Sequence, residues 1–86
     1  MTYRITVKKT AAKEIDALPT KVAGKVVNAI WKLADEPRPI GCKKLKGQKG
    51  DLWRIRVGDY RVIYSIEDQV KIIDVQKVGH RKHIYE

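Results

Sequence analysis

The chain has 86 residues, of which 43% are hydrophobic and 34% are charged, so it has room for one modest core and is not a disordered chain. Its 19 basic and 10 acidic residues give a net charge of +9, which indicates an anionic partner such as a nucleic acid, a ribosome or an acidic protein. The single cysteine, Cys42, excludes an internal disulfide. With no signal-peptide pattern and no apolar run of transmembrane length, we expect a cytoplasmic protein without a membrane partner.

The first half of the chain predicts one strand and two helices. Residues 2–7 alternate and are rich in strand-forming residues, which predicts a strand. Helices are predicted over 10–18, with Thr10 as a cap, and over 20–35, with a break at Pro19. Their apolar residues recur three or four positions apart, as Ala11, Ile15 and Leu18 and then as Val22, Val26, Ala29, Ile30 and Leu33.

The second half predicts a loop followed by an antiparallel meander. Residues 37–51 are expected to form a lysine-rich loop or to lead into a strand, and strands are expected over 51–57, 60–66 and 70–76. The third of these is apolar on both faces, as a central strand would be. The whole chain then forms a single α+β domain over residues 1–86, with both helices packed on one face of an antiparallel sheet. Trp31 and Trp53 are expected in the core.

Three arginines gather on the hairpin of residues 52–64. Arg54 and Arg56 are two positions apart, so both point to one face of a strand, and Arg61 follows on the returning strand. These guanidinium groups repel one another unless an anion lies among them, and guanidinium matches phosphate well. The alternative is a solvated face with salt bridges to Asp51, Asp59 or Glu67. The nearby lysines Lys43, Lys44, Lys46 and Lys49 are expected to extend a phosphate-binding rim.

The residue types favour RNA chemistry without a metal. His80 and His83 are three positions apart, but no zinc-binding motif is present, so neither a metal nor another cofactor is expected. In RNA, the 2′-hydroxyl can attack the adjacent phosphate while cationic side chains stabilise the developing charge. The base and the acid remain open among His80, His83, Tyr85 and a lysine with a lowered pKa.

Several motifs resemble the RelE family of bacterial and archaeal toxins: Lys44-Leu45-Lys46-Gly47, the segment Leu52–Tyr64, Val78-Gly79-His80-Arg81 and Ile84-Tyr85. The resemblance covers nearly the whole chain and implies a toxin that enters the ribosomal A site and cuts mRNA there by metal-free 2′-hydroxyl attack. It implies that Arg54 and Arg56 orient and neutralise the phosphate. It implies that Arg61 stabilises the transition state and Arg81 the leaving group or phosphate. Family members often have lysines where this chain has Arg54 and Arg56, and arginine is a poor base, so proton transfer falls to Tyr85 or His83.

The resemblance also implies partners. A cognate acidic antitoxin, similar to RelB, is expected to cover the basic site, and operator DNA is expected to be contacted only through that antitoxin. The ribosome and mRNA are expected to be bound by Lys43, Lys44, Lys46, Lys49, His80 and Lys82. Two alternatives stay open: a non-enzymatic inhibitor of DNA gyrase, like the ParE branch of the superfamily, and a non-catalytic RNA-binding module.

Overall fold

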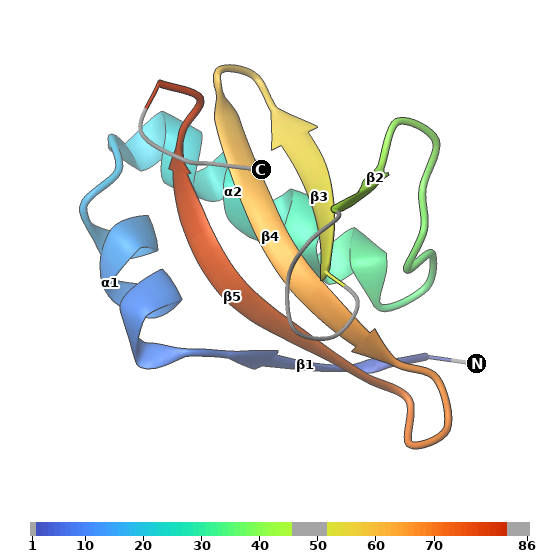
Figure 1. The fold of residues 1–86 in the computed structure, drawn as a ribbon. Helices are drawn as coiled ribbons and strands as arrows, with labels where there is room; N and C mark the ends of the chain where they lie inside the picture. The colour runs from blue at the N-terminus through green and yellow to red at the C-terminus, as the bar shows by residue number, and fades with distance from the viewer. Residues whose placement is uncertain (1, 46–51, 83–86) are drawn as a thin grey trace.

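Two helices and five strands form the described part of the chain, which is residues 2–45 and 52–82 of a computed structural model (Figure 1). In chain order they are β1 (Arg4–Val7), α1 (Lys9–Asp16), α2 (Thr20–Leu33), β2 (Lys43–Leu45), β3 (Leu52–Val57), β4 (Tyr60–Glu67) and β5 (Ile72–His80). The predicted elements are all present, with ends that coincide or differ by up to four residues.

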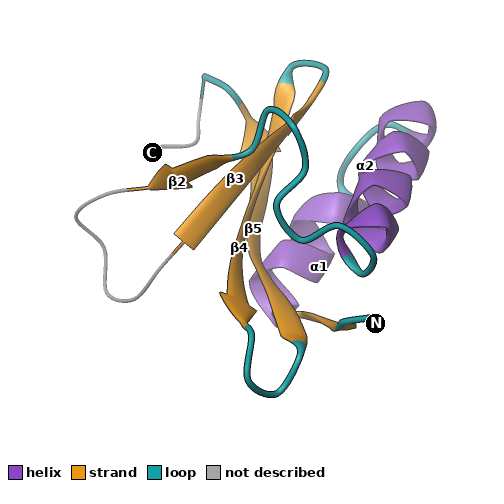
Figure 2. Cartoon of the chain, turned by 90° about the vertical axis from the view of Figure 1, so that its right-hand side faces the viewer, coloured by secondary structure: helices purple, strands orange, loops and turns teal. Residues whose placement is uncertain are grey.

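The strands form one sheet in the order β1-β5-β4-β3-β2, with β4 at its centre. Strand β1 runs parallel to β5, and the other neighbours are antiparallel. Figure 2 shows both helices on one side of this sheet. The predicted α+β class and the helix-covered face are confirmed. One detail of the prediction was wrong, because the sheet is mixed rather than purely antiparallel. The lysine-rich segment, predicted as a loop or a strand lead-in, contains the short edge strand β2.

The core lies between the helices and the sheet. The apolar stripe of α2 supplies Val26, Ile30 and Leu33, all nearly inaccessible to solvent, because a repeat of three or four residues keeps one helix face toward the sheet. Ala11 of α1 is fully buried beside them. The strands contribute alternate residues to this cluster: Ile55, Val62, Tyr64, Ile73, Val75 and Val78.

Trp31 is not in the core, contrary to the prediction, because 63% of its surface is exposed. It follows Ile30 on α2, and one residue further along a helix turns the side chain by about 100°, away from the buried stripe. Trp53 does pack against the core and is half-buried, with the Arg38 guanidinium carbon 5.0 Å from its ring centroid. Strand β5 also runs four residues beyond its predicted end, and it is an interior strand that lies between β1 and β4.

A β-bulge changes the alternation of β5. Ile63 of β4 pairs with Lys77, whereas the next residue, Tyr64, pairs with Val75, so Gln76 is the extra residue. An inserted residue shifts every later side chain to the other face. The bulge therefore keeps Val75 and Val78 in the core while Lys77 lies on the opposite, helix-free face.

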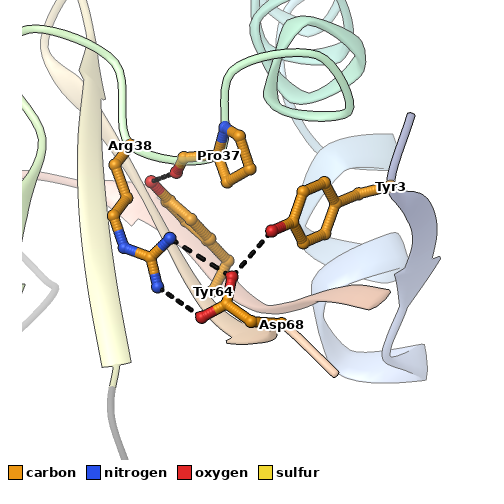
Figure 3. Close-up of polar contacts among 5 residues, drawn as sticks. All are labelled: Tyr3, Pro37, Arg38, Tyr64 and Asp68. Atoms are coloured by element: carbon orange, nitrogen blue, oxygen red, sulfur yellow. Dashed lines mark hydrogen bonds and ion pairs between the residues drawn. The ribbon is translucent and has the colours of Figure 1, made fainter. Parts of the chain in front are cut away.

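The Tyr64 hydroxyl is a buried polar group with a defined partner. It donates a hydrogen bond of 2.8 Å to the carbonyl oxygen of Pro37, in the segment that follows α2 (Figure 3). Burial raises the pKa of Tyr64, so the hydroxyl stays protonated and able to donate.

Tyr64→Phe should lower the free energy of unfolding by about 1–2 kcal/mol, because it leaves the Pro37 carbonyl without its donor. Urea denaturation of both proteins measures this difference. An unchanged midpoint would mean that the hydrogen bond contributes nothing to stability.

A second polar cluster joins three distant parts of the chain. Arg38 donates two hydrogen bonds to Asp68, at 2.9 and 3.3 Å, and the Tyr3 hydroxyl donates a third to the same carboxylate at 2.7 Å (Figure 3). The contacts tie the segment after α2 to the β4–β5 turn and to the residues before β1. The hydrogen bond from Arg38, followed by that from Tyr3, lowers the pKa of Asp68.

This shift predicts a specific loss of stability in acid. Because the folded pKa of Asp68 lies below its ordinary value of 3.8, its contribution is complete above that value and is lost as the pH falls through the folded pKa. Asp68→Asn should therefore be less stable than the natural chain at pH 7, and the gap should narrow below about pH 4. Urea denaturation at several pH values checks this, and a gap that does not change with pH would contradict it.

Candidate nucleic-acid interface

The helix-free side of the sheet carries rows of basic side chains. Residues that pair directly across neighbouring strands point to the same face. One row runs from Lys43 through Arg54 and Ile63 to Lys77, across β2, β3, β4 and β5. The next row joins Arg56 to Arg61 and ends at Gly79, which has no side chain. We call these five cations the basic face: Lys43, Arg54, Arg56, Arg61 and Lys77.

Two features of the basic face distinguish it from an ordinary solvated surface. Arg56 and Arg61 lie directly opposite each other, and like charges in that position destabilise a sheet. Arg54, in the adjacent row, is only 4% exposed, which is unusual for an arginine. The face therefore concentrates positive charge, part of it removed from water, and an anion bound there would relieve the repulsion.

Arg81 lies at the same end of the sheet as the Arg56–Arg61 pair. Its backbone N–H donates a 2.8 Å hydrogen bond to the carbonyl oxygen of Asp59, in the β3–β4 turn. Its Nε lies 3.8 Å from the Asp59 carboxylate, and both side chains are more than half exposed. Such an exposed pair is weak, so the Arg81 guanidinium is available to another anion.

Two residues that the sequence grouped with the RNA-binding lysines lie on the other side of the sheet. Lys44 pairs with Trp53, and its Nζ lies 5.9 Å from the Trp53 ring centroid, on the helix side. His80 pairs with Tyr60 and contacts it edge to face, with ring centroids 5.3 Å apart. The Nδ1 atom of His80 accepts a 3.2 Å hydrogen bond from the backbone N–H of Lys82. Lys82 is exposed to solvent.

The structure brings together only part of the predicted site. It places Arg54, Arg56 and Arg61 on one face with Lys43, and Arg81 at its end. The described residues do not include Lys46, Lys49, His83 and Tyr85. The last two are the groups predicted to transfer protons. Among residues 2–45 and 52–82, no three histidine, cysteine or acidic side chains are grouped to hold a metal ion. Nor is any helix there long and apolar enough to cross a membrane.

Lys77 is a member of the basic face that sequence reasoning missed. Strict alternation from the buried residues Ile73 and Val75 would place it in the core. Its exposure on the opposite face depends on the bulge at Gln76, for which the sequence carries no glycine or other recognisable signal.

Comparison with known proteins identifies the class. The family model described as "ParE toxin of type II toxin-antitoxin system, parDE" matches residues 5–85. Toxin RelE of Mycobacterium tuberculosis is 31% identical over 84 residues, which cover 96% of this chain and 86% of that toxin.

Two solved complexes have the same fold. The archaeal RelE–RelB complex from Pyrococcus horikoshii contains a chain that is 35% identical, with a TM-score of 0.83 and coverage of 98% of this chain and 100% of that one. The toxin–antitoxin complex RelBE2 from M. tuberculosis gives a TM-score of 0.83 at 28% identity, covering 94% and 100%.

The fold and the comparisons together identify this chain as a toxin of a type II toxin–antitoxin system. Within that class, the chain belongs to the RelE family of the RelE/ParE superfamily.

Proposed function

We propose that this toxin is an endoribonuclease that cuts mRNA in the ribosomal A site and so inhibits translation. The observation that carries the proposal is the facing pair Arg56–Arg61, with the buried Arg54 beside it and Arg81 at the same end of the sheet. Guanidinium groups at fixed positions suit a phosphodiester whose charge increases during cleavage.

The reaction uses the RNA's own nucleophile. The 2′-oxygen attacks the adjacent phosphorus, the bond from phosphorus to the 5′-oxygen breaks, and the products are a 2′,3′-cyclic phosphate and a 5′-hydroxyl. Arg54 and Arg56 hold and neutralise the phosphate, Arg61 stabilises the transition state, and Arg81 stabilises the leaving group or phosphate. The tail supplies proton transfer through His83 or Tyr85. No metal or cofactor is required in this scheme.

The proposed partners follow from charge and from the relatives. Several solved relatives are complexes of RelE with RelB, which supports a RelB-like antitoxin as the partner of this chain. A net charge of +9 favours an acidic antitoxin and salt-sensitive association. The substrate is mRNA on the ribosome in the cytoplasm, and operator DNA is contacted only through the antitoxin.

Two assays on the purified toxin test the proposal together. Primer extension on mRNA in translating ribosomes should show new 5′ ends within the A-site codon. A supercoiling assay with DNA gyrase should show no inhibition. Gyrase inhibition with intact mRNA would replace the proposal with the alternative that the ParE family model favours. Salt-sensitive RNA binding without cleavage would instead indicate a non-catalytic RNA-binding module.

A further inference from the structure

A groove lies at the edge of the sheet, between the C-terminal half of α2 and β3, next to the segment that leads from α2 to β2. Its volume is about 630 Å³, within the range of about 300–1,000 Å³ typical of binding clefts. Figure 2 shows α2 standing beside this edge of the sheet, with the connecting segment between them. Five apolar residues line it: Ala29, Leu33, Pro39, Ile40 and Ile55.

Ile40 is the most unusual of the lining residues because its side chain is fully exposed to solvent. A single exposed isoleucine is ordinary, but this one borders a concave surface whose other apolar members include the buried Leu33 and Ile55. An apolar side chain from a partner would be covered by Ile40 on one side and by the groove floor on the other. This arrangement suits an anchoring contact.

The rim of the groove is cationic. Lys32 and Arg56 outnumber the single acidic residue, Glu36. Arg56 also belongs to the basic face, so the groove opens directly onto that face at the β3 edge. A second copy of this chain, itself carrying +9, is disfavoured here by charge, whereas an acidic chain is favoured.

The geometry points to this groove as the anchor site for an acidic segment of the antitoxin, with an apolar side chain in the groove and carboxylates toward Lys32 and Arg56. A segment seated there covers Arg56, one of the groups that the proposed function assigns to phosphate. The inference rests on the antitoxin partner of that proposed function but not on its cleavage chemistry.

The test measures binding of the antitoxin encoded beside this chain's gene, titrated calorimetrically in the absence of RNA. Ile40→Glu should weaken binding at least tenfold, because it removes apolar contact and repels the acidic segment. The matched control Val70→Glu places the same charge at an exposed valine in the β4–β5 turn and should change affinity less than twofold. Both side chains are exposed, so both variants should keep the natural chain's thermal midpoint.

Two further variants make the outcome decisive. Ile40→Lys should lose less affinity than Ile40→Glu, and an equal loss would contradict the acidic character of the segment. Trp31→Glu tests the exposed outer face of α2 as the rival anchor. The inference is overturned if Ile40→Glu binds within twofold of the natural chain, or if Trp31→Glu causes the larger loss. Because no RNA is present, the binding result is independent of whether the toxin cleaves mRNA.

Discussion

Arg61→Ala should reduce A-site mRNA cleavage by about 10²–10³-fold, the usual effect of removing one preorganised group that stabilises transition-state charge. Arg61 is half-buried on the central strand and faces Arg56, so its position is set by the sheet rather than by a loop. Replacing it also removes a like-charge contact, so stability should stay equal or rise slightly while activity falls. Cleavage is measured by single-turnover primer extension on programmed ribosomes.

Two control variants distinguish the effect of the charge at this site on cleavage from the effect of the toxin's total charge. Lys25→Ala removes one positive charge from α2, on the opposite side of the molecule from the basic face, and should cleave within twofold of the natural rate. Arg61→Lys keeps the charge but loses bidentate geometry, so its rate should lie between those of the natural toxin and Arg61→Ala. If Arg61→Ala cleaves at the natural rate, Arg61 has no part in the reaction.

Ile73→Ala should be the most damaging of the proposed changes to the fold. Ile73 is fully buried on β5, between the sheet and the helices. Replacing a buried isoleucine by alanine lowers the free energy of unfolding by about 2–5 kcal/mol. That is a large part of the 5–15 kcal/mol typical of whole domains. In a domain of this size, each kcal/mol lowers the melting temperature by about 4–8 °C.

Ile40→Ala is the matched control for this prediction, since it makes the same chemical change at a fully exposed isoleucine. Its free energy of unfolding should stay within about 0.5 kcal/mol of the natural value. Thermal and urea denaturation of both variants give the comparison. Equal losses for the two variants would show that the described core does not carry the stability of the fold.

Periodicity predicted the helices and their buried faces because the repeat that places apolar residues on one helix face is a local property of the sequence. The repeat that joins Val26, Ile30 and Leu33 is visible in the sequence, and these are the α2 residues that the structure buries. Trp31 was misplaced because it was taken to lie opposite the polar faces, whereas it follows Ile30 and falls outside the buried stripe.

The features that escaped prediction depend on contacts between distant strands. Strand β2 has only three residues, two of them lysines, and it forms because it pairs with β3. The bulge at Gln76 likewise appears only when β5 is aligned with β4. Neither has a local sequence pattern, so the edge strand and the position of Lys77 required the assembled sheet.

The candidate site likewise combines features that the sequence predicts with features that depend on the assembled sheet. A two-residue spacing was enough to predict that Arg54 and Arg56 share a face. The burial of Arg54 was not predictable, because it depends on neighbours brought in by β2 and β4. The helix-side positions of Lys44 and His80 follow from pairing with Trp53 and Tyr60, which again is a property of the sheet.

The most direct test of the proposed activity uses two mRNAs that differ by one oxygen atom. Ribosomes are programmed with an all-ribose message or with one carrying a single 2′-deoxynucleotide at the cleaved position of the A-site codon. The account predicts a cut with a 5′-hydroxyl product in the first message and no cut at that position in the second. Equal cleavage of both messages, or cleavage of neither, would contradict it.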